Sequence, residues 1–223
     1  MSTIHPSPLR VVVLISGSGS NLQALIDGMK SGDLPIEIAA VISNRPDVFG
    51  LTRAQEAGIH TQVLDHKNFD SRDSFDTELM QTIDNYAPGL VVLAGFMRIL
   101  TPEFTQHYLG RMLNIHPSLL PKFQGLHTHQ RALDAGESHH GVTVHFVTAE
   151  LDGGPAVIQA RVPILTGDDA GTLAKRVQRQ EHVIYPLAVK WFALGKLTMQ
   201  EGHAVLNDEL LPATGYQIEA NEP

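Results

Sequence analysis

The chain has 223 residues, and 43% of them are hydrophobic, which is enough for one substantial core in a single domain or a small two-lobed one. With 24 acidic and 16 basic residues, its formal net charge is -8, which argues against a broad surface for nucleic acid or an anionic membrane. Cysteine is absent, so disulfide scaffolds, thiolate metal sites and cysteine nucleophiles are excluded.

Strand-like and helix-like segments alternate in the first half of the chain. Short apolar runs of the kind found in buried parallel strands predict strands at residues 10–16, 36–42, 61–64, 90–94 and 111–115. Apolar residues at helical spacing predict helices at residues 21–30, 49–57 and 75–86. This alternation predicts a Rossmann-like α/β fold, a mostly parallel twisted sheet with helices on both faces, in which ligands bind at the edge where strands lead into helices.

The pattern changes after residue 140. Residues 141–147 alternate between apolar and polar side chains, residues 156–164 are again β-rich, and the turn L-D-G-G-P lies between them, so we expect a long antiparallel hairpin. A helix at residues 172–194 follows. We therefore expect a disordered N-terminal extension at residues 1–9, one domain at 10–215 with an antiparallel C-terminal extension of the sheet, and a tail at 216–223.

Neither a membrane span nor a signal segment is visible in the sequence. There is no run of 18 apolar residues, and the N-terminal M-S-T-I-H-P-S-P-L-R is polar and contains proline. We therefore expect a soluble cytoplasmic protein that binds neither nucleic acid nor membranes.

A glycine-rich loop, S-G-S-G-S-N-L at residues 16–22, joins the first strand to the first helix. Glycines let backbone N–H groups approach an anion closely, and the helix N-terminus adds partial positive charge. A dinucleotide loop would need a third glycine where Leu22 stands, and an acidic residue at the end of the second strand, which instead reads I-S-N. The loop therefore favours a single terminal phosphate, and the alternative is a tight turn without a ligand.

The segment N-I-H-P-S-L-L-P carries Asn114 and His116 at the end of the fifth strand. Two residues apart on an extended backbone, their side chains point to the same side, and Pro117 and Pro121 stiffen the segment. An amide and an imidazole together can bind a carbonyl oxygen as it becomes an oxyanion; the alternative is a core asparagine and a capping histidine. Asp152 is the candidate charge partner of His116, although Asp-Gly is also a common turn sequence.

Twelve histidines in a chain without cysteine raise the question of a metal site. His127, His129, His139, His140 and His145 lie close together in the sequence, but there is no H-E-x-x-H motif. We therefore favour surface or supporting histidines over metal ligands and expect no metal requirement.

Five segments together resemble the folate-dependent formyltransferase family: S-G-S-G-S-N-L, A-G-F-M-R-I-L, N-I-H-P-S-L-L-P, H-F-V at 145–147 and L-D-G-G-P at 151–155. The resemblance covers residues 10 to 215. The glycine-rich loop and R-V-Q-R-Q-E-H at 176–182 make it closest to the branch of purine synthesis. It implies transfer of a formyl group from 10-formyltetrahydrofolate, the co-substrate, to the primary amine of 5'-phosphoribosylglycinamide by a monomer or weak homodimer.

The same resemblance implies the roles of individual residues. Asn114 and protonated His116 stabilise the oxyanion of a tetrahedral intermediate, while Asp152 keeps His116 charged and helps a proton move through water. The implied contacts of the phosphoribosyl substrate are Gly19, Ser20, Asn21, Gln178, Arg179, Gln180 and Glu181. The implied contacts of the folate are Arg72, Met97, Arg98, Ile99, Leu100, Asn114, Thr148, Ala149, Glu150, Leu151 and Asp152.

One residue departs from the pattern of the family: Gln124, in P-K-F-Q-G, stands where a proline is more often expected. We expect it to alter loop stiffness without touching any of these roles.

Four alternatives remain open. A formyltetrahydrofolate deformylase shares the N-I-H-P segment but usually has an additional N-terminal regulatory domain. A methionyl-tRNA formyltransferase would need a tRNA-binding domain and a basic surface. A phosphate-ligand sensor would explain the glycine-rich loop alone, and a histidine-based metallohydrolase would require a metal.

Overall fold

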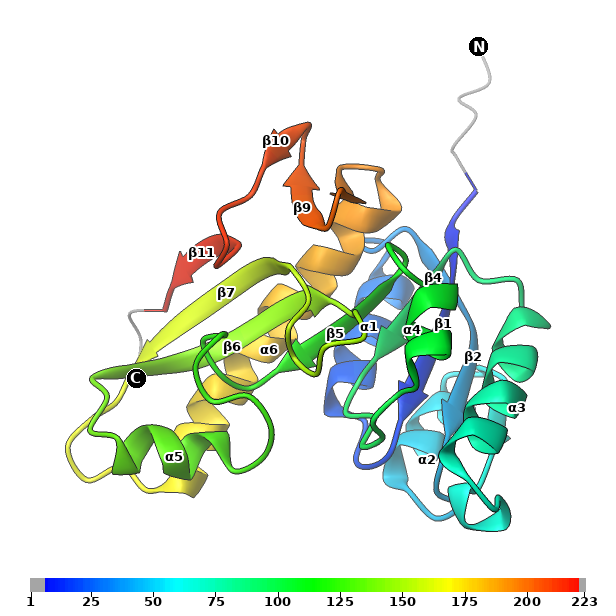
Figure 1. The fold of residues 1–223 in the computed structure, drawn as a ribbon, viewed down its shortest axis with the longest axis horizontal. Helices are drawn as coiled ribbons and strands as arrows, with labels where there is room; N and C mark the ends of the chain where they lie inside the picture. The colour runs from blue at the N-terminus through cyan, green and yellow to red at the C-terminus, as the bar shows by residue number, and fades with distance from the viewer. Residues whose placement is uncertain (1–6, 221–223) are drawn as a thin grey trace.

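The computed structural model describes residues 7–220, and two sheets are present in this range (Figure 1). The larger has eight strands in the order β11-β7-β6-β5-β4-β1-β2-β3. Its parallel part consists of β1 (Leu9–Ile15), β2 (Ile36–Ser43), β3 (Thr61–Val63), β4 (Leu90–Leu93) and β5 (Met112–His116). The predicted parallel α/β sheet is confirmed.

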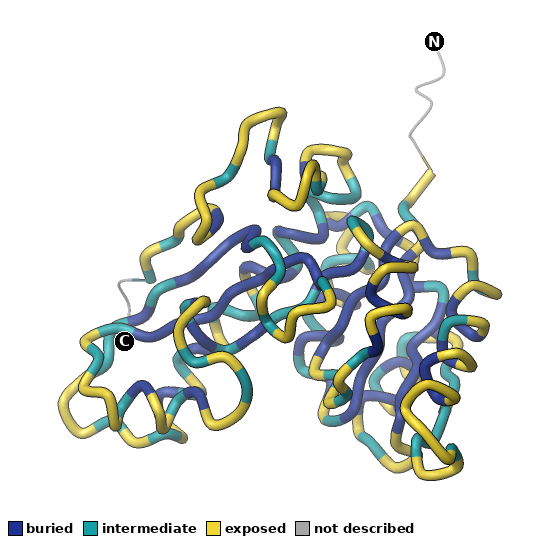
Figure 2. The backbone as a smooth tube through the Cα atoms, in the orientation of Figure 1, coloured by how far each residue is buried: buried dark blue, intermediate teal, exposed yellow. Residues whose placement is uncertain are grey.

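Helices cover both faces of this sheet, as the alternation of the sequence predicts. The helices are α1 (Ser20–Ser31), α2 (Phe49–Glu56), α3 (Arg72–Asp84), α4 (Pro102–His107), α5 (Thr128–Asp134) and α6 (Ala170–Ala193), with a short 3-10 turn at η1 (His66–Asn68). In β1, Val11 and Val13 pack into a core with α1 and α6, whereas Val12 and Leu14 pack into a second core with α3 and α4. All four are fully buried, so the strands form the dark central layer of Figure 2.

Some helix boundaries differ from the prediction because capping decides them. α3 begins at Arg72, three residues before the predicted start, because the Ser71 hydroxyl accepts from the Ser74 N–H in a capping box. α4, which the periodicity did not predict, starts at Pro102 behind the Thr101 cap and has only six residues. Such a segment is too short to show a helical period.

Beyond β5 the sheet continues with an antiparallel part, as predicted. β6 (His139–Phe146) and β7 (Ala156–Pro163) pair as the expected hairpin, and β6 also runs antiparallel to β5. A separate three-stranded antiparallel sheet is formed by β8 (Leu197–Gln200), β9 (His203–Leu206) and β10 (Glu209–Leu210).

The structure differs from the expected chain ends. β11 (Tyr216–Glu219), expected in the tail, pairs in parallel with β7 and closes that edge of the sheet. Gly215 allows the approach, because a Cβ there would lie 2.7 Å from the carbonyl carbon of Val157. At the other end Leu9 already belongs to β1, and residues 1–6 of the predicted extension lie outside the described range. Within residues 7–220 no helix is both long and apolar enough to cross a membrane.

Candidate active site

The glycine-rich loop at the end of β1 is shaped by its contact with α2. Gly19 has a φ of 73°, and a Cβ there would lie 2.7 Å from the Cα of Gly50. The N–H of Gly50 donates to the Gly17 carbonyl at 3.1 Å, and Arg53 Nε donates to the Ser18 carbonyl at 2.7 Å. No side chain caps α1, so its first N–H groups are available to an anion at the loop.

Helix α6 brings the predicted second group of substrate residues to this loop. Asn21 Nδ2 donates to Glu181 Oε2 at 2.9 Å, and Gln178 Nε2 donates to Ser20 Oγ at 3.1 Å. Burial raises the pKa of Glu181, and the Asn21 hydrogen bond partly opposes that shift. Gln180 is half-buried on the same helix, and Arg179 is exposed.

Two buried polar atoms at this end lack a hydrogen-bond partner within residues 7–220. They are Asn21 Oδ1, beside the loop, and Nε2 of His182, the neighbour of Glu181. Burial of polar atoms without partners is costly, so a ligand or water that completes them would be favoured here.

The catalytic candidates meet at the end of β5. His116 is 6% exposed; its Nδ1 lies 3.5 Å from Asp152 Oδ2, and its Nε2 lies 2.9 Å from the Phe123 carbonyl oxygen. The Gly125 N–H donates to the same Asp152 oxygen at 3.0 Å. A carbonyl and a carboxylate only accept hydrogen bonds, so the His116 ring satisfies both when both its nitrogens carry protons.

Asn114 is oriented by a histidine on the neighbouring strand. His145 lies opposite Asn114 in the β5–β6 register, and the two side chains are 3.3 Å apart, Asn114 Nδ2 to His145 Nε2. His145 Nδ1 donates to the Phe146 carbonyl at 2.9 Å, which leaves Nε2 as the acceptor. Burial lowers the pKa of His145 and favours this neutral form. The sequence predicted only a surface or supporting histidine at this position, and the strand register reveals that its partner is Asn114.

Most of the predicted folate residues lie in the two segments that follow β4 and β6. Met97 and Ile99 are 64% and 57% exposed in the irregular segment after β4, which also holds Arg98 and Leu100. Leu151 is 53% exposed in the loop after β6, where Thr148, Ala149 and Glu150 precede it. These exposed apolar side chains suit a flat ring system.

Arg72 and Arg98 lie near a common carboxylate. Both positive charges oppose the rise in the pKa of Asp76 that burial causes. The Asp76 carboxylate also accepts from the Thr101 N–H at 2.7 Å, and the Arg98 guanidinium lies 5.1 Å from the centre of the Phe75 ring. Arg72 itself is exposed at the start of α3.

Within the described part of the chain, the remaining histidines do not form a group that could hold a metal ion. His129 Nδ1 and His140 Nε2 lie 3.1 Å apart, and burial lowers both pKa values, that of His140 to about 4. Among residues 7–220, no three His, Cys, Asp or Glu side chains are grouped so that they could hold a metal ion.

The expectation that Gln124 touches none of the proposed roles was wrong. Its Nε2 lies 3.4 Å from the Leu151 carbonyl oxygen and 3.3 Å from that of Asp152. The contact spans 27 or 28 residues, so no local pattern in the sequence indicates it.

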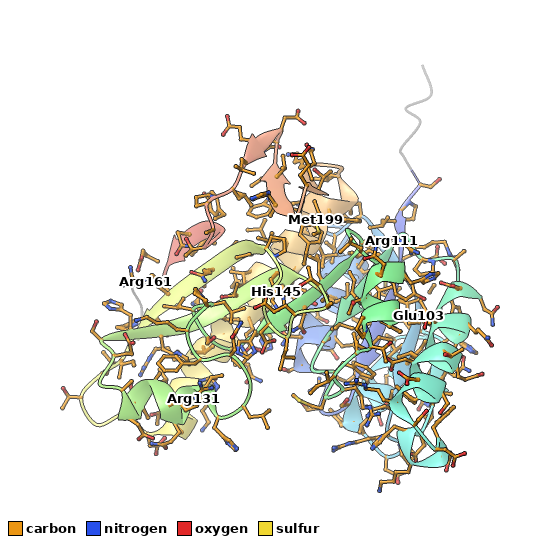
Figure 3. The ribbon with its side chains drawn as sticks, viewed as in Figure 1. Glu103, Arg111, Arg131, His145, Arg161 and Met199 are labelled. Atoms are coloured by element: carbon orange, nitrogen blue, oxygen red, sulfur yellow. The ribbon has the colours of Figure 1, made fainter. Side chains whose placement is uncertain are left out.

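Both groups of residues lie beside strands of the central sheet; Figure 3 labels His145, which is on β6. A glycine-rich loop follows β1. Two strands away, at the end of β5, His116 contacts Asp152 and Asn114 contacts His145. These residues form one candidate site at the edge of the sheet where β1 and β5 end. The model of the Formyl transferase family matches residues 9–189, and the chain belongs to this family.

Two relatives within this family are similar to the chain over most of its length. The chain is 57% identical to the phosphoribosylglycinamide formyltransferase of Escherichia coli over 208 residues, 93% of this chain and 98% of that protein. It is 46% identical over 192 residues to the human trifunctional purine biosynthetic protein adenosine-3, which covers 86% of this chain and 19% of that protein.

A solved structure of such a relative has the same fold as this chain. The phosphoribosylglycinamide formyltransferase of Coxiella burnetii superposes with a TM-score of 0.92 at 53% identity, over 95% of this chain and 99% of that one.

Proposed function

We propose that this formyltransferase moves the formyl group of 10-formyltetrahydrofolate to the primary amine of 5'-phosphoribosylglycinamide, in cytoplasmic de novo purine synthesis. The products are the N-formyl compound and tetrahydrofolate. The observation that carries this proposal is the contact of His116 with Asp152 at the end of β5, with Asn114 two residues earlier on the same strand and the glycine-rich loop two strands away. Two inter-strand steps span about 10 Å, which suits a phosphate and an amine at opposite ends of one substrate.

In this mechanism the amine nitrogen attacks the formyl carbon and a tetrahedral intermediate forms. The Asn114 amide, one of whose N–H groups faces His145, has a second N–H to donate to the developing oxyanion. The charged His116 ring, held between Asp152 and the Phe123 carbonyl, stabilises the negative charge electrostatically. The carbon–nitrogen bond to the folate then breaks, and Asp152 helps a proton pass through water from the amine to the folate nitrogen.

The binding residues divide between two ends of the site. At the phosphate end the loop at Gly19 and Ser20 binds the phosphate, while Glu181 and the unpartnered Asn21 Oδ1 accept hydrogen bonds from the rest of the substrate. At the folate end the pteridine lies against the apolar side chains of Met97, Ile99 and Leu151. The other residues of the phosphate end lie on α6 and are Gln178, Arg179 and Gln180. The other residues of the folate end are Arg72, Arg98, Leu100, Thr148, Ala149 and Glu150.

All the proposed catalytic groups come from one chain, so a monomer or a weak homodimer suffices. One domain over residues 10–215, with β11 added to its sheet, contains every one of them. Analytical ultracentrifugation across a range of protein concentrations measures the assembly state.

The proposal is tested by mixing the purified protein with 10-formyltetrahydrofolate and following tetrahydrofolate release with and without phosphoribosylglycinamide. We expect release to require the amine and to continue unchanged in a chelator. Release without the amine would favour a hydrolytic deformylase, and loss of activity in the chelator would favour a metallohydrolase. A substrate without its phosphate should bind far more weakly if the glycine-rich loop holds that group.

A further inference from the structure

Three consecutive residues contact the proposed catalytic pair. The Phe123 carbonyl lies 2.9 Å from His116 Nε2, and the Gly125 N–H donates to Asp152 Oδ2 at 3.0 Å. Between them, the Gln124 side chain reaches the carbonyl oxygens of Leu151 and Asp152 at 3.4 and 3.3 Å. This segment therefore connects the catalytic histidine to the loop that carries Asp152.

The backbone of residues 123–127 is in an unfavourable conformation at several positions. Phe123, Gly125 and His127 have φ values of 54°, 80° and 57°. A residue with a side chain in this left-handed region costs about 1 kcal/mol or more, so other contacts must stabilise Phe123 and His127.

Arg131 on α5, labelled in Figure 3, supplies such contacts. Its Nη1 donates to the Gln124 carbonyl at 2.6 Å and lies 3.2 Å from the Leu126 carbonyl. Its guanidinium carbon is 5.4 Å from the centre of the Phe123 ring, within the range of a cation–π contact. Arg131 therefore holds the Gln124 carbonyl and the Phe123 ring, on either side of the Phe123 carbonyl that contacts His116.

We propose that Gln124 and Arg131 are positioning residues that couple the folate loop at 148–152 to His116. This inference rests on the proposed function, which places the folate against that loop. Gln124 acts through the Leu151 and Asp152 carbonyls and so governs folate binding. Arg131 acts through the Gln124 carbonyl and the Phe123 ring, which set the position of the Phe123 carbonyl, and so governs the orientation of His116 during turnover.

Gln124 is tested by a pair of substitutions. In Gln124→Ala the two carbonyls lose their shared donor, and we expect KM for the folate to rise about fivefold, with kcat and KM for the amine within about twofold. Gln124→Glu has the same size but sets a carboxylate against two carbonyl oxygens, so KM should rise more than in Gln124→Ala. The Kd of tetrahydrofolate, measured by calorimetry, should follow the same order.

Arg131 is tested through its effect on turnover. We expect Arg131→Ala to lower kcat about tenfold and to shift the pH dependence of kcat, because the Phe123 carbonyl no longer holds the His116 ring in place. Arg131→Lys keeps a charged group whose N–H can donate to the Gln124 and Leu126 carbonyls, and it should restore part of kcat.

The matched control is Gln130→Ala. Gln130 is the neighbour of Arg131 on α5, and its Nε2 donates to Asp134 Oδ1 at 2.7 Å. This variant should leave kcat and both KM values within about twofold, since it removes only an i,i+4 helix contact.

The inference is overturned if Gln124→Ala raises both KM values equally, or if Gln124→Glu binds tetrahydrofolate as well as wild type. It is also overturned if Arg131→Ala lowers thermal stability without changing the pH profile. Failure of the proposed function looks different: wild-type protein would then release tetrahydrofolate without the amine, or not at all.

Discussion

The phosphate end and the catalytic end of the site differ in the chemical groups that form them. At the phosphate end, backbone groups predominate: Gly19 packs against Gly50, and the N-terminus of α1 is left uncapped. At the catalytic end, side chains predominate, and His116 and Asp152 are held by backbone groups of Phe123 and Gly125. The phosphate end therefore depends on space for the backbone, whereas the catalytic end depends on hydrogen-bond partners for its side chains.

One helix links the two ends. Glu181 on α6 accepts from Asn21 at the phosphate end, and four residues later the Tyr185 hydroxyl lies within 2.7 and 3.0 Å of the Leu93 and Leu113 carbonyls, on the strands β4 and β5. The two ends nevertheless consist of different residues, so substitutions at the phosphate end should act mainly on binding of the amine substrate. Those at the catalytic end should act on turnover.

The largest expected effect is at the catalytic end. His116→Ala and Asp152→Asn should each lower kcat by about a thousandfold or more, because the charge that faces the oxyanion is lost. Asp152 has a φ of 51°, which asparagine also tolerates, so the turn should survive. Steady-state kinetics measures kcat, and thermal unfolding checks the fold. Near-normal turnover in either folded variant would refute the assignment.

At the phosphate end the sharpest change is Gly19→Ala. Its Cβ would lie 2.7 Å from Gly50 Cα, so we expect a loss of roughly 2–4 kcal/mol in the free energy of unfolding, together with a higher KM for the amine. Gly32→Ala is the control: its φ is 84°, but no atom lies within 4 Å of the added Cβ. Denaturant unfolding should show a loss of only about 1 kcal/mol there, and equal losses would contradict the steric argument.

The buried histidines near the catalytic end should make stability depend on pH. The pKa of His140 falls to about 4, mainly through burial and then through the charges of His129 and His116, while Glu137 opposes the shift. The unfolded chain gains a proton near pH 6.5 and the folded chain does not, so stability is full above that pH and decreases as pH falls towards 4. The expected decrease is roughly 2–3 kcal/mol.

His140→Gln tests this source of the pH dependence. Unfolding free energies at several pH values between 4 and 8 should show a shallower slope in the variant. Burial also lowers the pKa of His129 and His145, so part of the slope should remain. An unchanged slope would show that His140 is not responsible.

The smallest expected effect is that of Gln178→Ala. This exposed side chain donates to Ser20 Oγ at 3.1 Å, and its loss should raise KM for the amine about fivefold while leaving KM for the folate unchanged. Gln124→Ala should do the reverse. If both variants changed the same KM, the division of the site into two ends would be wrong.

The sequence by itself determined the parallel sheet and the two local motifs. Continuous apolar runs such as residues 90–94 mark strands buried on both faces, and a glycine-rich turn before a helix marks an anion loop, because each depends on neighbours in the chain. Similarly, Asn114 and His116 share one side of a strand through spacing alone.

Only the tertiary structure decided which distant groups meet. Asn21 and Glu181 are 160 residues apart, Asn114 finds His145 through the antiparallel register, and Gln124 reaches carbonyls 27 and 28 residues away. Likewise, β11 was expected as a tail because its pairing with β7 leaves little mark on its own sequence. Periodicity reports which side of an element is buried. It does not report which donor or acceptor lies opposite, and the positions of the catalytic side chains depend on that.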